Sequence, residues 1–168
     1  MVMFAACKGD EAATPASAKA IEPASDPSAA PKQRLVIERM GLAIEVPAGT
    51  TVSPPHRPEE ALTSAHLEQG DFMLNLRAVD EYSVPNLAAV KQSSAGDKLI
   101  AEHRAEETPT GWIAIQEVDS KLHEKVVFNT SVRLRVAGEA WDCSVAAKTR
   151  AYADLAVAAC LTLAPDKP

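Results

Sequence analysis

The chain has 168 residues, of which 46 % are hydrophobic and only 4 % aromatic, and its formal net charge at pH 7 is −6. This length accommodates one domain of ordinary size plus additional segments, and the core is expected to consist mainly of aliphatic side chains. The acidic balance, without a stripe of Lys and Arg, argues against nucleic-acid binding, and no run of about 18–20 apolar residues could span a membrane as a helix.

The N-terminus contains a short apolar run that ends at Cys7. The segment Phe4-Ala5-Ala6-Cys7 resembles the lipobox of bacterial lipoproteins, in which small residues precede a cysteine that becomes alkylated with diacylglycerol. The family's usual Leu is replaced by Phe4, and the charged and apolar segments that precede a lipobox are missing, which a start at a downstream Met would explain. The resemblance implies that residues 1–7 are the remnant of a signal peptide and lipobox, with a lipid on Cys7 as the membrane contact. The alternative is an ordinary N-terminus that contains a cysteine.

Residues 8–33 form a second segment, which is dominated by Ala, Pro, Ser and Thr. It has too few large apolar side chains to offset its chain entropy, so we expect a disordered tether that its prolines keep partly extended. Behind a lipidated cysteine, such a tether would hold a domain off a bilayer in the bacterial envelope, facing the periplasm, and two acyl chains anchor a protein stably. Lys8, directly after Cys7, favours the outer membrane by the family's sorting habit. The alternative is a disordered tail without a task.

Residues 34–165 are expected to form a single folded domain. Alternation of apolar and polar residues, bounded by turn residues, predicts strands at 35–37, 42–46, 64–69, 72–78, 99–106, 112–118, 126–136 and 141–145, with a Pro-rich loop at 47–58. Ser83 is a suitable N-cap for a helix that ends at Gly96, and a last helix is expected at about 151–161.

The clearest of these patterns is the strand Val126–Val136. Its period of two places Val126 and the other apolar residues on an inward face, and it places Arg133 and Arg135 on an outward face. Arg77 occupies the outward face of the strand 72–78. If the two strands are neighbours, Arg77, Arg133 and Arg135 would line one face of the sheet as a ligand site for a carboxylate or phosphate group. The alternative, which we favour, is that each arginine pairs with a nearby acidic residue on a solvated face.

The order of elements favours an α+β fold, with a mainly antiparallel sheet on which a central and a C-terminal helix pack. The segments Leu42-Ala43-Ile44-Glu45-Val46-Pro47 and Cys160-Leu161-Thr162-Leu163, with a helix and a long hairpin between them, resemble small PsbP-like lipoproteins of the bacterial envelope. The resemblance spans most of residues 34–165 and admits an α/β/α sandwich. These lipoproteins share no common chemistry, and most of them bind or assemble with other proteins, so the resemblance implies a role of that kind.

If the protein is exported, the three cysteines are expected to have two different roles. Lipidation would occupy Cys7 and leave Cys143, on a strand, and Cys160, near the end of the last helix, to form a disulfide. Such a bridge would pin the helix to the sheet and stabilise the domain by roughly 3 kcal/mol. The alternative is a pair of buried free thiols, as in a cytosolic protein.

Motifs for nucleotide binding, metal binding or a nucleophilic serine are missing from the sequence. The histidines, which are His56, His66, His103 and His123, lack the spacing of metal ligands. His103 is expected to be a hydrogen-bonded core or edge residue, and the acidic run Glu102, Glu106 and Glu107 is expected to lie at a solvated sheet edge. We therefore expect no cofactor, no metal and no catalytic residue.

Two functional classes remain open at this level. The first is a lipid-anchored, non-enzymatic envelope protein whose domain binds another protein of unknown identity. The second is a small-ligand binder or hydrolase that uses the arginine-lined sheet face or the loop around His56. The lipobox-like start, the tether and the lack of catalytic motifs favour the first class.

Overall fold

The structure is a computed structural model that describes residues 27–53, 60, 62–80, 86–93 and 97–167. The strands are β1 (Lys32–Ile37), β2 (Leu42–Pro47), β3 (Thr51–Ser53), β4 (Ser64–Gln69), β5 (Phe72–Val79), β6 (Lys98–Thr108), β7 (Gly111–Ser120), β8 (Lys125–Val136), β9 (Glu139–Ala147) and β10 (Ala164–Pro165). The helices are α1 (Leu87–Ser93) and α2 (Arg150–Cys160), with short 3₁₀ helices η1 (Pro27–Ala29) and η2 (Glu38–Met40).

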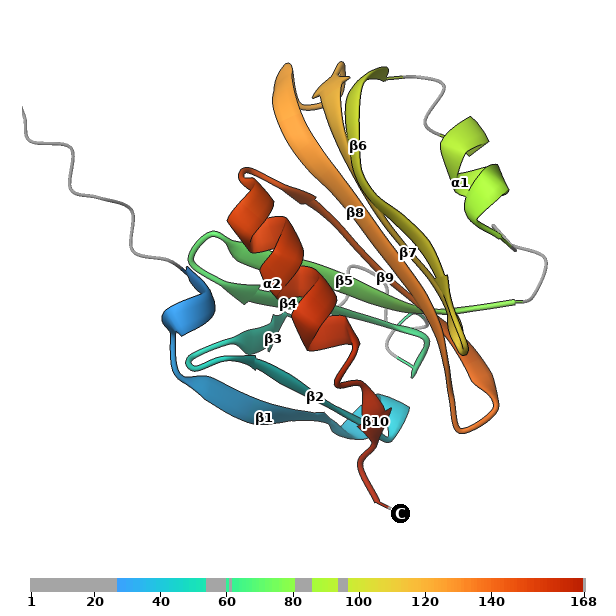
Figure 1. Cartoon of the computed structure of the whole chain (residues 1–168). Helices are drawn as coiled ribbons and strands as arrows, with labels where there is room; N and C mark the ends of the chain where they lie inside the picture. The colour runs from blue at the N-terminus through green and yellow to red at the C-terminus, as the bar shows by residue number, and fades with distance from the viewer. Residues whose placement is uncertain (1–26, 54–59, 61, 81–85, 94–96, 168) are drawn as a thin grey trace, which may run out of the picture.

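Within the described residues the strands form two antiparallel sheets (Figure 1). The larger sheet has seven strands in the order β3-β4-β5-β9-β8-β7-β6, and the smaller one has three in the order β1-β2-β10. The antiparallel sheet with a central and a C-terminal helix confirms the α+β class that the sequence predicted. Strand β3 lies within the segment expected to be a loop, and β10 was not expected; both are too short to leave a periodic pattern.

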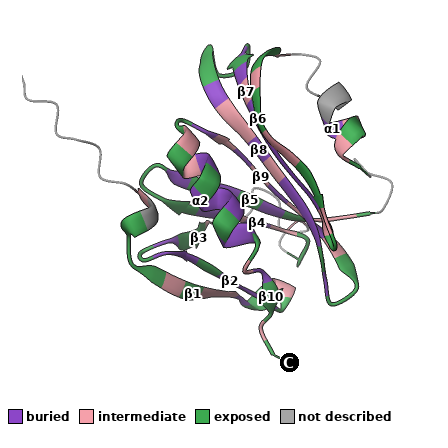
Figure 2. Ribbon diagram, viewed as in Figure 1, coloured by how far each residue is buried: buried purple, intermediate pink, exposed green. Residues whose placement is uncertain are grey.

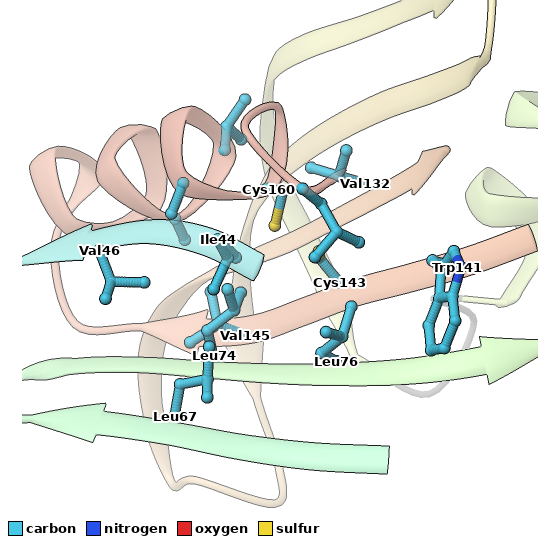
Figure 3. Close-up of a cluster of buried hydrophobic side chains, with 14 of the residues drawn as sticks. Ile44, Val46, Leu67, Leu74, Leu76, Val132, Trp141, Cys143, Val145 and Cys160 are labelled. Carbon is cyan, nitrogen blue, oxygen red and sulfur yellow. The ribbon is translucent and has the colours of Figure 1, made fainter. Parts of the chain in front are cut away.

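The core lies between one face of the seven-stranded sheet, here called the inner face, and the layer formed by α2 and the smaller sheet (Figure 1). Alternate residues of β5, namely Phe72, Leu74 and Leu76, point into it and are at most 1 % exposed. Ile44 and Val46 of β2 reach the same cluster from the smaller sheet (Figure 3). Most buried residues lie in this layer (Figure 2), which makes it the main source of hydrophobic stabilisation.

Helix α2 covers the inner face because its sequence combines a cap with an apolar stripe. The Thr149 hydroxyl accepts a hydrogen bond from the backbone N–H of Tyr152 at 3.4 Å and so caps the first turn. The residues of α2 that are buried are Ala153, Leu155, Ala156, Val157, Ala159 and Cys160. Small residues predominate among them, which lets the helix approach the sheet closely. Helix η1 also contacts α2, so the folded unit starts at or before Pro27, earlier than the expected boundary at Arg34.

The opposite face of the seven-stranded sheet, here called the outer face, carries α1 near β6 and β7 (Figure 1). Val90 of α1 packs in a small apolar cluster with Trp112 and Ala114 of β7. The side chain of Asn86 caps the helix, since its Oδ1 accepts the backbone N–H of Ala89 at 3.0 Å. The expected cap Ser83 lies outside the described residues, as does Gly96.

Strand β8 departs from the predicted alternation at its beginning. Val126, expected on the inward face, is 45 % exposed, whereas Val127 is buried. Val127 lies opposite Val118 of β7, which is also buried. The face of β8 that carries Val126 is therefore open where the strand begins, while the face that carries Val127 is covered. Further along the strand both faces are covered, since the outward-facing Arg133 is only 7 % exposed between the buried Val132 and Leu134, so burial does not alternate there.

The two edges of the large sheet differ in length and regularity. Strand β3 is a three-residue edge, and β6 is an eleven-residue edge. The pairing of β6 with β7 shifts register twice, between Leu99 and Ala101 and between Glu102 and Arg104. Glu102, Glu106 and Glu107 all lie exposed on this edge strand, which confirms the expected edge position of the acidic run.

Candidate functional site

The outer face is the polar surface of the large sheet. Its residues come from four adjacent strands, β5, β9, β8 and β7, and they are Asn75, Arg77, Asp142, Ser144, Ala146, Asn129, Ser131, Arg133, Arg135, Trp112, Ala114 and Gln116. Side chains alternate along a strand, so each of these residues follows one that faces the packed inner layer. The alternation that places aliphatic side chains in the core therefore also creates the outer face. The side chains there carry mainly amide, hydroxyl and guanidinium groups.

A row of charged residues crosses the outer face. Arg77 of β5 lies opposite Asp142 of β9, Asp142 lies opposite Arg133 of β8, and Arg133 lies opposite Trp112 of β7. The guanidinium carbon of Arg133 is 5.9 Å from the centroid of the Trp112 ring, within the range of a cation–π interaction. The sheet register thus places one carboxylate between two guanidiniums and one guanidinium on an aromatic ring.

The charges in this row are partly removed from water. Burial raises the pKa of the Asp142 carboxyl, and the nearby charges of Arg133 and Arg77 oppose this rise without cancelling it. Burial likewise lowers the pKa of the Arg133 guanidinium, against the attraction of Asp142. Because both shifts have the sign of desolvation, electrostatic interactions at this place are less screened than on an open surface.

The structure only partly brings together the three arginines that the sequence predicted to form one ligand site. The structure places Arg77, Arg133 and Arg135 on the same face, but it inserts Asp142 between Arg77 and Arg133. Arg133 and Arg135 line a cleft of about 300 Å³ together with Trp112, Asn86 and Thr108, and Arg77 is not part of its lining. Asp142 and Trp112, which the sequence analysis did not select, are therefore central to the site. Alternation placed Asp142 outward, but only the strand register could show that it separates the two arginines.

Gly111 is the tightest point at the border of this cleft. A Cβ atom at this position would lie 2.0 Å from the carbonyl oxygen of Arg133, so only glycine lets β7 approach β8 here. The backbone N–H of Arg135 donates to the carbonyl of Thr110 at 3.0 Å in the same region. The position of Arg133 beside Trp112 thus depends on a backbone contact that a side chain would block.

A second cleft, of about 390 Å³, lies on the outer face beside α1. Its lining is mostly uncharged and polar and includes Asn75, Gln116, Asn129, Ser131 and Ser144, with Val90 of α1 and Asp97 at its border. Amides and hydroxyls both donate and accept hydrogen bonds, so the cleft suits a ligand surface rich in hydrogen-bonding groups. We call it the amide cleft.

The histidines with described positions do not form a catalytic or metal-binding group. His66 Nδ1 lies 2.6 Å from Asn75 Oδ1, and His103 Nε2 lies 2.8 Å from Glu117 Oε2. His103 is thus a hydrogen-bonded residue of the edge strand β6. The sequence predicted a hydrogen-bonded position either in the core or at an edge, and the edge position is the observed one. His56 lies outside the described residues. Among the residues that the structure describes, no group of His, Cys, Asp or Glu is arranged to hold a metal ion.

Cys143 and Cys160 lie together in the core (Figure 3) but are free thiols in this structure, so the expected disulfide is not formed. Both are 1 % exposed, and their side chains share a hydrogen bond. Burial is the main cause that raises the pKa of the Cys160 thiol well above its usual value, and the contact with Cys143 adds to it. Reduced thiols in this place act as small apolar side chains. Cys7, the expected lipidation site, lies outside the described residues.

Comparisons with known proteins give a distant structural likeness. No protein-family model matches the chain, and no curated protein matches its sequence. The solution structure of cyanobacterial PsbP (CyanoP) from Synechocystis sp. PCC 6803 is similar, with a TM-score of 0.48, 14 % identity, and coverage of 88 % of this chain and 96 % of that one. The α+β assignment rests on the strands and helices themselves. In the described part of the chain, no helix has the length and apolarity needed to cross a bilayer.

Proposed function

We propose that the protein is a lipid-anchored, non-enzymatic module of the bacterial envelope that binds a partner protein through the outer face of its large sheet. The observation that carries this proposal is the contrast between the two faces of the sheet. The inner face supplies the main hydrophobic core, while the outer face keeps amide, hydroxyl and guanidinium groups around two clefts. Polar side chains that are not needed for the core are available for recognition.

The environments of His66 and His103 support a binding rather than a catalytic role. A serine or cysteine nucleophile needs a base within hydrogen-bonding distance. In the described part of the chain, His66 contacts Asn75 and Glu68, and His103 contacts Glu117, so neither ring is bonded to a hydroxyl or thiol. The buried thiol of Cys160 has a raised pKa, which disfavours the thiolate that a nucleophile requires.

The envelope location rests on the lipobox-like segment at Cys7 and on the tether. In an oxidising envelope we further propose a Cys143–Cys160 disulfide. It would form when an oxidising exchange partner removes two electrons and two protons from the two thiols. The contact between the two thiols supports this step. The intact mass of the protein from native membranes, with and without reductant, tests both parts. We expect a diacylglyceryl mass on a chain that begins at Cys7 and a gain of two hydrogens on reduction; an unmodified chain from Met1 with free thiols contradicts them.

Site-specific photocrosslinking tests the binding face. A benzophenone amino acid at Asn75, which is exposed and borders the amide cleft, should crosslink the full chain to one reproducible partner in the cell. The matched control places the same group at Asp154, which is exposed on α2 on the other side of the domain. Equal crosslinking from both positions, or none from Asn75, contradicts the proposal.

A small anionic ligand is the second candidate, and the cleft around Trp112 favours it. The buried indole Nε1 of Trp112 has no hydrogen-bond acceptor in the structure, and Arg133 and Arg135 line the same cleft. Donors and positive charge together suit a carboxylate or a phosphate. Titration with inorganic phosphate and with acetate, followed by the indole N–H signals in an NMR spectrum, distinguishes this candidate. A saturable shift that Arg135→Met weakens supports it, and unchanged signals exclude it for these anions.

A further inference from the structure

A third cleft, of about 660 Å³, lies at one end of the large sheet, toward the lower right of Figure 1. Four segments that are distant in sequence form it, namely η2, the residues before β4, the end of β5 and the β8–β9 hairpin. Its volume exceeds that of the amide cleft and falls within the range of roughly 300–1,000 Å³ that is typical of small-molecule sites. We call it the end cleft.

The wall of the end cleft is mainly apolar. Each of the four segments contributes apolar side chains to it, namely Met40, Leu62, Ala78, Val79 and Trp141. Leu62 is 67 % exposed, whereas Trp141 is 2 % exposed, so the apolar wall extends from solvent to the core. The backbone N–H of Ala78 donates to the carbonyl of Thr63 at 2.7 Å, which holds the segment of Leu62 beside β5. An apolar wall that leads to a buried aromatic ring suits a small apolar molecule.

Trp141 also brings a polar group to this wall. It lies opposite Ala78 of β5 and Leu134 of β8. Figure 3 shows it at the end of the labelled cluster, with its ring nitrogen on the side away from Leu76. The indole Nε1 is buried, and among the described residues it has no hydrogen-bond acceptor. Because an indole N–H only donates and is usually paired when buried, a ligand oxygen that accepts from it would complete the site.

The charged side chains that border the end cleft balance one another. Arg39 and Arg135 are exposed there, and so are Asp80 and Glu139. Two positive and two negative groups among the described lining residues favour neither an anion nor a cation. A net charge is costly to move from water to an apolar wall, so the balance favours an uncharged ligand.

We propose that the end cleft binds an uncharged, mainly apolar small molecule whose carbonyl oxygen accepts a hydrogen bond from Trp141 Nε1. The apolar part of this ligand packs against Met40, Leu62 and Val79, and the carbonyl reaches the buried indole. The site is independent of the proposed partner-binding position, because Asn75 lines the amide cleft and not the end cleft.

Titration of the full chain with two ketones, followed by the indole N–H signals in an NMR spectrum, tests the site. The probes are butyrophenone, which is aromatic, and methyl hexyl ketone, which is aliphatic; phenylbutyrate is the charged counterpart. We expect a saturable downfield shift of the Trp141 N–H proton with both ketones, and a several-fold weaker response to phenylbutyrate at equal concentration. The Trp112 indole is the internal reference, because it does not line the end cleft.

Two matched variants locate the binding. Leu62→Asp should weaken ketone binding several-fold, because it places a carboxylate on the apolar wall, and the fold should persist since Leu62 is exposed. The control is Leu122→Asp, because Leu122 is 85 % exposed in the turn after β7 and does not line the end cleft. Three results would overturn the proposal: an unchanged Trp141 signal with both ketones, a stronger response to phenylbutyrate than to butyrophenone, or equal weakening by the two variants.

Discussion

The inner and outer faces of the large sheet share the same strands but have opposite character. Along β5, Leu74 is 1 % exposed on the inner face, while its neighbour Met73 is 39 % exposed on the outer face. The inner face is continuous with α2 and the smaller sheet, whereas on the outer face the described helix α1 packs near β6 and β7. The contrast teaches that folding depends on one face, which leaves the other available for recognition.

The largest expected effect on stability comes from comparing two neighbouring residues of β5, one on each face of the sheet. Leu74→Ala should lower the free energy of unfolding by about 2–5 kcal/mol, because it leaves a cavity in the core. Met73→Ala, on the outer face of the same strand, should cost no more than about 0.5–1 kcal/mol. Urea denaturation of both variants measures the difference. Equal losses would show that the outer face also carries folding energy.

A second test sharpens the comparison at the one place where the outer face is tightly built. Gly111→Ala should lower the free energy of unfolding by about 1–3 kcal/mol, because its Cβ would meet the Arg133 carbonyl at 2.0 Å and force β7 from β8. Gly70→Asn is the control, since its site is open and Asn tolerates the left-handed φ of 58°. Thermal denaturation of both variants measures the difference in stability. Equal stabilities would contradict the inference that β7 and β8 require glycine at position 111.

The smallest expected effect is a pH dependence from Asp142. Burial raises the pKa of the Asp142 carboxyl in the folded protein above its usual value of 3.8, so the folded state binds this proton more tightly than the unfolded state does. As pH falls from neutral through the raised pKa to below 3.8, the wild-type protein should therefore gain stability relative to Asp142→Asn, which cannot ionise. Each unit of pKa difference corresponds to about 1.4 kcal/mol. Denaturation curves of both proteins at several pH values measure the change, and a constant difference contradicts it.

Most of the fold was predictable from the sequence, because antiparallel strands with one buried face carry a period of two. Strand β4 was predicted with its observed bounds, and β5, β7, β8 and β9 were predicted to within a few residues. The prediction that Val126 is buried was wrong, because its face of β8 is open where the strand begins and Val127 on the other face is buried instead. The pattern of one strand cannot show what lies above its outer face.

The candidate site was less predictable, because it depends on how strands align rather than on what each strand contains. Arg77 and Asp142 are far apart in sequence and become neighbours only through the register of β5 with β9. The same register of β9 with β8 brings Arg133 to the other side of Asp142. Sequence alone therefore identified three arginines on one face but missed the carboxylate between two of them.

The irregular edge of the large sheet has a consequence for a protein confined to a surface. Molecules held on a membrane meet one another far more often than molecules in solution, and a long regular edge strand would allow them to join sheet to sheet. Strand β6 is interrupted by two shifts of register and carries exposed glutamates, and the other edge is only three residues long. Both features oppose pairing with a second copy. If the protein is held on a membrane, as proposed above, these two edges oppose the joining of neighbouring copies sheet to sheet.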